Sequence, residues 1–444
     1  MFTFPKNFMW GAATASYQIE GSPLADGAGD SIWHRFSHTP GTTYNRENGD
    51  VANDHYNRYP DDISLMKDLG LKAYRMSIAW PRIYPTGTGR INQAGLDFYE
   101  RLIDTLLEAD IIPFVTIYHW DLPGDLQDRG GWANREVVDW FGEYATTLYA
   151  RFGDRVKNWI TLNEPSVVSK RGHLDGAQAP GLNDYWAALR VTHNLMRAHG
   201  RAVQIYRAVG GDGQIGITVN ITPQHPATDS DEDIAAADRN DAFLNRAYLD
   251  PIFRGSYPEV LSEWFGEAWP DIREGDLEET HSPIDFLGVN YYTRQVTAHK
   301  PGVGVVDAEQ VKQSGEHTLM GWEVYPDGLR EALTWVRDNY GDLPLYVTES
   351  GASFEDRFDD GGEIADDSRL KYLRTHFAAS HRAIQDGVDL RGYFVWTFID
   401  NFEWAFGYSR PFGLVHCDFE TQKRTIKKSG HWYRDVIANN GIDR

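Results

Sequence analysis

The sequence predicts a single (β/α)8 barrel that occupies residues 1–444 as one catalytic domain. Short apolar runs alternate with amphipathic segments along the whole chain, and no linker or low-complexity tract separates them. Apolar residues on both faces of such runs are typical of a parallel sheet that is covered by helices. Because eight strand–helix units can be assigned, a closed barrel is favoured over an open, doubly wound sheet.

The predicted strands are rich in β-branched and aromatic residues, which favour extended backbone. They are Phe8–Ala13, Ala73–Trp80, Ile111–His119, Asn158–Asn163, Gln214–Asn220, Ile284–Tyr291, Leu343–Thr348 and Leu390–Thr397. The segments between them place apolar residues on one stripe, as expected of helices that cover a sheet. The predicted helices are Ala94–Asp110, Arg135–Phe152, Asp184–Ala208, Ser368–Asp386 and Thr425–Ala438.

The composition restricts the possible partners. The net charge is −22, from 65 acidic and 43 basic residues, and no basic stripe is present. This argues against nucleic acid and against an anionic membrane surface as partners. Cys417 is the only cysteine, so no internal disulfide can form. The N-terminus lacks a signal-like apolar run, and no segment approaches the ~20 apolar residues of a membrane span. We therefore expect a cytoplasmic protein that acts on a small molecule; its oligomeric state stays open.

Polar and aromatic side chains follow most of the predicted strands. Since catalytic groups of (β/α)8 barrels lie at the carboxyl ends of strands, these side chains are expected to meet in one pocket. Two of them, Glu164 and Glu349, each follow an apolar strand and lie in a turn marked by Pro165 or Gly351. A single glutamate after a strand is usually a solvated loop residue, but a pair of this kind favours a functional reading.

Two carboxyl groups across a pocket suggest cleavage of a glycosidic bond. One carboxyl group protonates the leaving oxygen, while the other either attacks the sugar carbon or activates water. A separation of ~5–5.5 Å indicates retention of configuration and ~6.5–9.5 Å indicates inversion. Sequence spacing leaves both outcomes open.

The segments around these glutamates, Thr161–Pro165 (TLNEP) and Val347–Gly351 (VTESG), resemble the two signature motifs of family 1 glycoside hydrolases, the β-glucosidase family. Other segments of the chain also resemble that family, in order and with similar spacing. They are Phe8–Gly21, Tyr74–Trp80, Tyr118–Pro123 and Asn290–Thr293. The resemblance extends from about residue 4 to residue 440 and implies a retaining β-glycosidase without a cofactor or metal.

The resemblance also implies individual roles. Glu164 would be the acid/base and Glu349 the nucleophile. Residues implied to bind substrate or to support the nucleophile are Gln18, His119, Asn163, Tyr292, Trp322, Trp396, Glu403, Trp404 and Phe412, with Arg75 and Asn290 in support. Taken alone, a histidine, arginine or tryptophan at these places is as readily a core residue as a ligand-binding one.

Electrostatics fit these roles. Arg75 and the Tyr292 hydroxyl are expected to lower the pKa of Glu349. The negative charge of Glu349 is expected to raise the pKa of Glu164, which keeps it protonated as an acid until Glu349 is esterified. Glu403 can accept hydrogen bonds from sugar hydroxyls and would repel a 6-phosphate. Neutral β-glucosides are therefore the expected substrates, with β-fucosides and β-galactosides also accepted.

The chain departs from the family pattern at two places. Ser350 follows the nucleophile where the family usually has Asn, and Arg410–Pro411 replaces the more usual Lys-Arg before Phe412. Both changes leave the reacting groups in place; one lies beside Glu349 and the other in the loop expected to border the sugar site.

Two other patterns are interpreted as structural. Gly211–Gly216 matches the letters of a dinucleotide-binding loop, but it is expected to end a helix and enter a strand, which is the wrong context. Asp356–Asp367 is acidic but lacks EF-hand spacing, so a solvated loop is expected rather than a calcium site. No paired-histidine motif or cysteine cluster was recognised as a metal site.

Three alternative functions remain compatible with the sequence. A transglycosylase would use the same site with an alcohol or sugar in place of water. A sugar-binding protein without catalysis is disfavoured because both carboxylates are present. An inverting hydrolase would place the carboxylates further apart.

Overall fold

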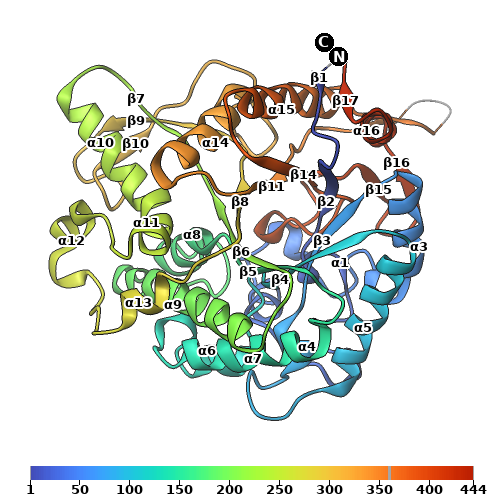
Figure 1. Cartoon of the computed structure of the whole chain (residues 1–444), viewed down its shortest axis with the longest axis horizontal. Helices are drawn as coiled ribbons and strands as arrows, with labels where there is room; N and C mark the ends of the chain where they lie inside the picture. Colours follow the sequence, from blue (N-terminus) through green and yellow to red (C-terminus); the bar gives the residue numbers. More distant parts are fainter. Residues whose placement is uncertain (1, 359–361, 444) are drawn as a thin grey trace.

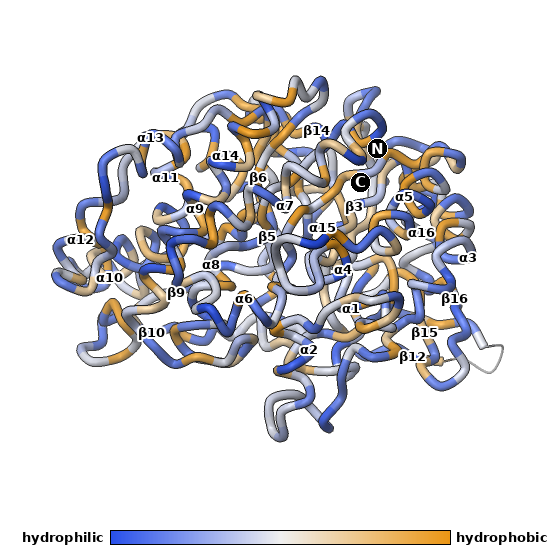
Figure 2. The backbone as a smooth tube through the Cα atoms, turned by 90° about the horizontal axis from the view of Figure 1, so that it is seen from below, coloured by the Kyte–Doolittle hydropathy of each residue, from blue (hydrophilic) through white to orange (hydrophobic). Residues whose placement is uncertain are grey.

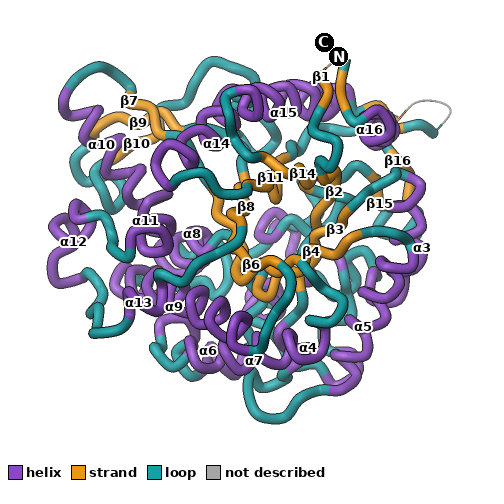
Figure 3. Tube along the Cα trace, in the orientation of Figure 1, coloured by secondary structure: helices purple, strands orange, loops and turns teal. Residues whose placement is uncertain are grey.

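The chain forms a closed barrel of parallel strands surrounded by helices (Figures 1 and 3). The computed structural model describes residues 2–358 and 362–443. The barrel strands, in the order in which they occur around the barrel, are β2 (Met9–Ala13), β3 (Ala73–Ser77), β4 (Ile112–Tyr118), β5 (Asn158–Asn163), β6 (Gln214–Asn220), β8 (Phe286–Asn290), β11 (Leu345–Ser350) and β14 (Leu390–Trp396). Strand β14 pairs with β2 and closes the barrel. The predicted fold class is confirmed.

Helices surround the barrel with their apolar faces turned inward, except α10, which packs on the small outer strands β7 and β9. The longer ones are α3 (His55–Asp68), α5 (Gln93–Glu108), α7 (Val137–Phe152), α9 (Tyr185–Ala208), α10 (Asp231–Asp241), α14 (Pro326–Tyr340), α15 (Asp367–Gln385) and α16 (Lys428–Asn439). Along these helices hydrophilic and hydrophobic residues alternate (Figure 2). None of the described helices is long and apolar enough to cross a membrane.

Aromatic rings fill the barrel below the strand ends. Phe114 on β4 contacts Tyr346 on β11 and Phe394 on β14, with ring centroids 5.3 and 4.8 Å apart. Glycine on the neighbouring strand provides the space, because a Cβ at Gly11 would lie 2.6 Å from the Phe394 ring. This packed layer closes the barrel interior, so a ligand can enter only from the strand ends.

Smaller sheets lie outside the barrel. Strands β7 (Gln224–Pro226), β9 (Gln295–His299) and β10 (Ala308–Gln310) form a three-stranded sheet. The chain ends pair as β1 (Phe2–Thr3) and β17 (Gly441–Ile442), which brings the two termini together (Figure 1). The sequence analysis did not predict these small sheets, because strands of two to five residues are too short to show a clear pattern.

The predicted elements agree with the structure except at two places. All eight strands and the first four predicted helices are present, with ends shifted by at most three residues. The helix predicted from Thr425 begins only at Lys428, because Arg424–Ile426 pair as β16 with β15 (Val415–Cys417). Gly211–Gly216 does lead from α9 into β6, as expected.

The loop predicted as solvated between Asp356 and Asp367 is the second difference, although residues 359–361 lie outside the described part. It carries two short paired strands, β12 (Arg357–Phe358) and β13 (Ile364–Ala365). Asp366 is buried and accepts hydrogen bonds from Arg369 and Ser429. The acidic residues at both ends of the loop thus form internal ion pairs.

Candidate active site

A cavity of about 490 Å³ opens at the carboxyl ends of the barrel strands. Many of the sequence-predicted site residues line it: His119, Glu164, Tyr292, Trp322, Glu349, Trp396, Glu403, Trp404 and Phe412. Strand register explains part of this convergence, because Glu349 on β11 lies beside Asn290 on β8. The remaining predicted residues, Gln18, Arg75, Asn163 and Asn290, hydrogen-bond to members of this set.

Glu349 lies at the base of the cavity and is 3% exposed. One carboxylate oxygen accepts from the Arg75 guanidinium at 2.6 Å, and the other accepts from the Tyr292 hydroxyl at 2.7 Å. Burial raises the pKa of Glu349, whereas Arg75 and Tyr292 oppose that rise. The expected direction of the Arg75 and Tyr292 effects is correct, but the expected net lowering of the pKa is wrong, because desolvation outweighs both partners in the free protein.

Glu164 follows β5 with left-handed backbone (φ 46°), and Pro165 starts the next helical turn. The carboxyl group is 6% exposed and accepts from the Asn290 amide at 2.7 Å. Asn290 was expected to support Glu349. Its hydrogen bond to Glu164 is an additional contact. Burial first, and then the charge of Glu349, raise the pKa of Glu164 to about 8. A group with this pKa is protonated at neutral pH, as an acid catalyst must be.

A hydrogen-bond chain fixes the groups behind the two glutamates. Arg75 can only donate, and its guanidinium lies 2.6 Å from Asn163 Oδ1. The Asn163 amide nitrogen therefore faces His119 Nε2, at 3.0 Å. Burial and the nearby Arg75 charge lower the pKa of His119, which keeps the ring neutral. With Nε2 accepting, Nδ1 carries the hydrogen, and Nδ1 has no protein partner among the described residues.

Gln18 and Glu403 form a second polar group at the site. The Gln18 amide nitrogen donates to the Phe402 carbonyl at 2.9 Å and contacts Glu403 Oε2 at 3.3 Å. Its carbonyl oxygen is buried and has no hydrogen-bond partner within the described chain. Burial and the Glu349 charge raise the pKa of Glu403 to about 8, which Gln18 and Trp396 partly oppose. These polar atoms without partners are of the kind that sugar hydroxyls satisfy.

Aromatic side chains form the rest of the cavity. Trp404 packs against Trp120 and Trp33, with centroids 4.7 and 4.5 Å apart. At the outer side of the cavity, the ring centroids of Trp322 and Phe412 are 6.4 Å apart. Trp33 went unrecognised in the sequence, because it lies on a short helix, α2 (Ile32–Ser37), remote from any strand end.

Sequence reasoning also missed much of the outer cavity. This part is lined by Val167, Arg171, Gln178, Thr222, Leu244, Thr293, Arg294, Gln295, Gln310 and Met320. These residues come from short helical segments, from loops and from the small outer sheet, where no periodicity marks which side chains face inward. They include amides, hydroxyls and guanidinium groups as well as apolar side chains.

The two departures from the family pattern lie just outside the cavity. Ser350 is buried, with its hydroxyl 3.4 Å from the Tyr372 hydroxyl. The Pro411 carbonyl accepts from Arg369 at 2.7 Å, in a buried ion cluster beside the site. Lys427 in this cluster lies 2.6 Å from Asp356 and 2.7 Å from Asp400.

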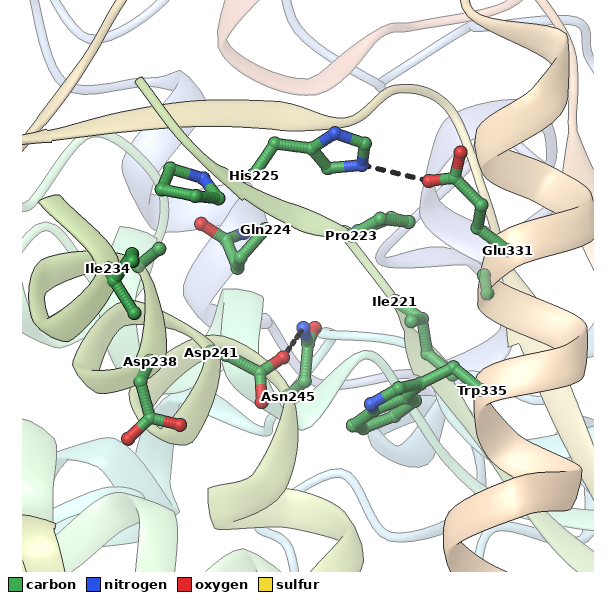
Figure 4. A pocket seen from close by; sticks show the side chains of 13 residues that line it. Ile221, Pro223, Gln224, His225, Ile234, Asp238, Asp241, Asn245, Glu331 and Trp335 are labelled. Atoms are coloured by element: carbon green, nitrogen blue, oxygen red, sulfur yellow. Dashed lines mark hydrogen bonds and ion pairs between the residues drawn. The ribbon is translucent and has the colours of Figure 1, made fainter. Parts of the chain in front are cut away.

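A second cavity, of about 380 Å³, lies outside the barrel between β7, α10 and α14 (Figure 4). There His225 donates to Glu331 at 2.8 Å, and Asn245 bonds to Asp241. Trp335 forms one wall. The carboxylates that line this second cavity are already paired with cations or amides. The second cavity therefore lacks the uncompensated acid pair of the barrel cavity.

Comparison with known proteins gives consistent matches over the full length. The family model for glycosyl hydrolase family 1 matches residues 1–442. The chain is 53% identical to a 1,4-beta-D-glucan glucohydrolase of Thermotoga neapolitana, with all of both chains covered. It is 44% identical to a bifunctional beta-D-glucosidase/beta-D-fucosidase of Bifidobacterium breve, with 98% of each covered. The structure of a beta-glucosidase from Thermotoga maritima in complex with deoxynojirimycin superposes with a TM-score of 0.98, at 53% identity and full coverage of both chains.

Proposed function

Since the chain belongs to glycosyl hydrolase family 1, we propose that it hydrolyses terminal β-D-glucosyl residues with retention, using Glu349 as nucleophile and Glu164 as acid/base. The whole of residues 1–444 serves as one catalytic domain in this proposal. The asymmetric pair of buried carboxyl groups is the observation that supports it best. Only Glu349 is held by a guanidinium and a phenol, so it ionises before Glu164.

In the first step the Glu349 carboxylate attacks the anomeric carbon, and the bond from that carbon to the leaving oxygen breaks. Glu164 gives its proton to that oxygen, so the leaving group departs as a neutral alcohol. Arg75 and Tyr292 hold Glu349 in position, and Tyr292 must release one oxygen as the ester forms.

In the second step the charge that raises the pKa of Glu164 is absent, because Glu349 is esterified. The pKa of Glu164 falls, and its carboxylate takes a proton from water as the water oxygen attacks the anomeric carbon. The ester bond breaks, Glu349 regains its charge, and Glu164 regains its proton. Two displacements at one carbon retain its configuration.

Sugar recognition is assigned to the wall formed by Gln18, His119, Asn163 and Glu403. The free carbonyl oxygen of Gln18 and the free N–H of His119 supply one acceptor and one donor. Trp396 offers an aromatic face, with Trp404 beside it. Glu403 can accept hydroxyl hydrogens, and the excess of carboxyl groups in the cavity disfavours a 6-phosphate. The B. breve relative acts on glucosides and fucosides, which supports the same breadth here.

Initial rates on 4-nitrophenyl β-D-glucoside test the nucleophile, with wild type and Glu349→Ala purified side by side. Fast release by wild type and almost none by the folded variant is the expected result. Equal release by both would remove Glu349 as nucleophile. The proton NMR spectrum of the first-formed sugar should show the β anomer, and an α anomer would contradict retention.

The acid role of Glu164 has a different signature. Glu164→Gln should leave the first step fast for 4-nitrophenyl glucoside, because this leaving group needs little protonation, but should slow release of the glycosyl intermediate. A burst of nitrophenol followed by a slow steady rate is therefore expected. Cellobiose, with a poor leaving group, should lose its rate in the first step. Equal loss on both substrates without a burst would contradict the assignment.

A further inference from the structure

Two histidines and an aspartate meet at the surface, outside the cavity described above. His34 lies on α2 and His38 directly follows it, four residues later, so both side chains lie on the same helix face. Their ring centroids are 4.3 Å apart. Asp50 approaches them from the next loop. Its two carboxylate oxygens lie 3.0 Å from His38 Nε2 and 3.8 Å from His34 Nε2.

Hydrogen bonding determines which nitrogen of His38 is free. His38 Nδ1 lies 2.7 Å from the His34 carbonyl, which can only accept, so Nδ1 carries a hydrogen. In a neutral His38 the lone pair of Nε2 would then point at the Asp50 carboxylate. Such an arrangement requires a cation between the two groups, either a proton on Nε2 or a metal ion.

The Asp50 carboxylate gives a second indication. Its Oδ1 atom is shielded from solvent and accepts no hydrogen bond from any described residue. A buried carboxylate oxygen without a partner is costly and calls for a ligand. This is also the oxygen that faces His34 at 3.8 Å. The side chains remain partly open to water, since His38 is 39% and Asp50 42% exposed.

We propose that His34, His38 and Asp50 bind one divalent transition-metal ion of the Zn²⁺ type, with water completing the coordination. Ligands bonded to Zn²⁺ at ~2.0–2.1 Å in a tetrahedron are about 3.3 Å apart. His38 Nε2 lies 3.0 Å from one Asp50 oxygen and His34 Nε2 lies 3.8 Å from the other, and the three ligand atoms lie within 4.8 Å of one another, so small side-chain rotations bring them to this spacing. The Nδ1–H bond of His38 to a backbone carbonyl is the second-shell contact that orients metal-binding histidines. The sequence analysis recognised no paired-histidine motif, but these two histidines are four residues apart, the spacing that places both on one helix face.

A second cluster of similar composition differs because a lysine ammonium group already lies between its carboxylates. Among the described residues, Asp356, Asp400 and His416 also come close enough to hold a metal. There the Lys427 ammonium already lies 2.6–2.7 Å from both aspartates. Within residues 2–358 and 362–443, no lysine or arginine forms an ion pair with Asp50.

The metal would join two segments that support the sugar-binding wall. Trp33, next to His34, packs on Trp404 in the cavity. On the other segment, Glu47 and Asn48 accept from the backbone N–H and the hydroxyl of Tyr408, at 2.7 Å each. Tyr408 belongs to the loop that carries Trp404. Binding should therefore raise thermal stability in proportion to metal occupancy, independently of the proposed glycosidase chemistry.

Calorimetric titration of untagged protein with ZnCl₂ tests the site, with MgCl₂ as the control ion. Wild type should bind one Zn²⁺ at this site, whereas Mg²⁺, which prefers oxygen ligands, should not bind there. His38→Asn and Asp50→Asn should weaken Zn²⁺ binding about tenfold or more, since even second-shell changes cost that much. The matched control is His431→Asn, which removes an exposed histidine elsewhere and should leave binding unchanged.

Thermal unfolding provides the second measurement. Zn²⁺ should raise the melting temperature of wild type and His431→Asn but not of His38→Asn or Asp50→Asn. All four proteins should hydrolyse 4-nitrophenyl glucoside equally without metal, which shows that the variants fold. Absence of Zn²⁺ binding by wild type, or equal binding by all four, would overturn the proposal and leave His38 and Asp50 as an ordinary ion pair.

Discussion

Two buried charge clusters adjoin β14 and differ in how far their carboxylates are compensated by cations. In the ion cluster, Asp356 and Asp400 face Lys427 and Arg369 at 2.6–3.0 Å. In the catalytic cavity, Glu164, Glu349 and Glu403 lie together, and among the described residues only Glu349 forms an ion pair, with Arg75 at 2.6 Å. Burial tends to raise the pKa of the Asp400 carboxyl group, but Lys427 and other cations hold it below its ordinary value. The pKa values of Glu164 and Glu403 rise to about 8.

This difference indicates what each cluster is for. Paired charges hold the loops after β11 and β14 in place. The excess of carboxyl groups in the cavity destabilises the fold, but it provides one ionised and one protonated glutamate at the same pH. The predictions below change the charge balance of one cluster at a time.

Glu349→Gln should have the largest effect. Loss of a nucleophile in covalent catalysis lowers kcat by about 10⁴-fold or more. It also removes the negative charge that raises the pKa of Glu164, so that pKa should fall. Carbonyl NMR of labelled Glu164 would measure the change. An unchanged Glu164 titration would mean that burial alone, rather than Glu349, sets its pKa.

Lys427→Met should be the most destabilising change in the ion cluster. It leaves two buried aspartates with less compensation, and breaking a buried pair costs about 3–5 kcal/mol. The matched control is Lys157→Met. Lys157 pairs with Asp212 at 2.6 Å, but the two side chains are 43% and 72% exposed, so almost no loss of stability is expected. Urea denaturation of both variants measures the difference, and equal losses would contradict the distinction between the clusters.

The sequence predicted the catalytic cluster better than the ion cluster. Glu164, Glu349 and Arg75 lie on or next to apolar barrel strands. The apolar pattern identifies these strands, and the barrel fold indicates that catalytic residues lie at their carboxyl ends. Asp356, Asp366 and Lys427 lie in loops or at a helix start, where nothing local distinguishes an internal ion pair from a solvated charge. The acidic segment Asp356–Asp367 was therefore expected to be exposed.

The electrostatic prediction for Glu349 shows a second limit. Its partners Arg75 and Tyr292 could be inferred from motifs, because a motif places residue types in a site. How far burial raises the pKa of Glu349 depends on how completely the Trp-rich walls exclude water. That quantity emerges only when side chains from several strands and loops are packed together.

The free energy of unfolding should fall with rising pH because of the buried carboxyl groups in the cavity. The folded-state pKa values of Glu164 and Glu403, about 8, exceed the ordinary value of 4.5. Their contribution is therefore complete below pH 4.5 and is lost as the pH rises through 8. Glu403→Gln should remove part of this loss, making the variant more stable than wild type by about 2–4 kcal/mol at pH 9 but not at pH 5. Urea denaturation at both pH values checks this; parallel pH curves would show that Glu403 is not protonated in the folded state.

Ser350→Ala should have the smallest effect, although residue 350 directly follows the nucleophile. Its hydroxyl lies 3.4 Å from the Tyr372 hydroxyl, which is at the long limit for a hydrogen bond. Glu349 is held instead by Arg75 and Tyr292, at 2.6 and 2.7 Å, and neither contact involves residue 350. We expect kcat/KM within about threefold of wild type and a stability loss below about 1 kcal/mol. A loss above tenfold would mean that the turn after β11 positions the nucleophile, and that the cavity depends on the residues connecting it to the ion cluster as well as on its own charges.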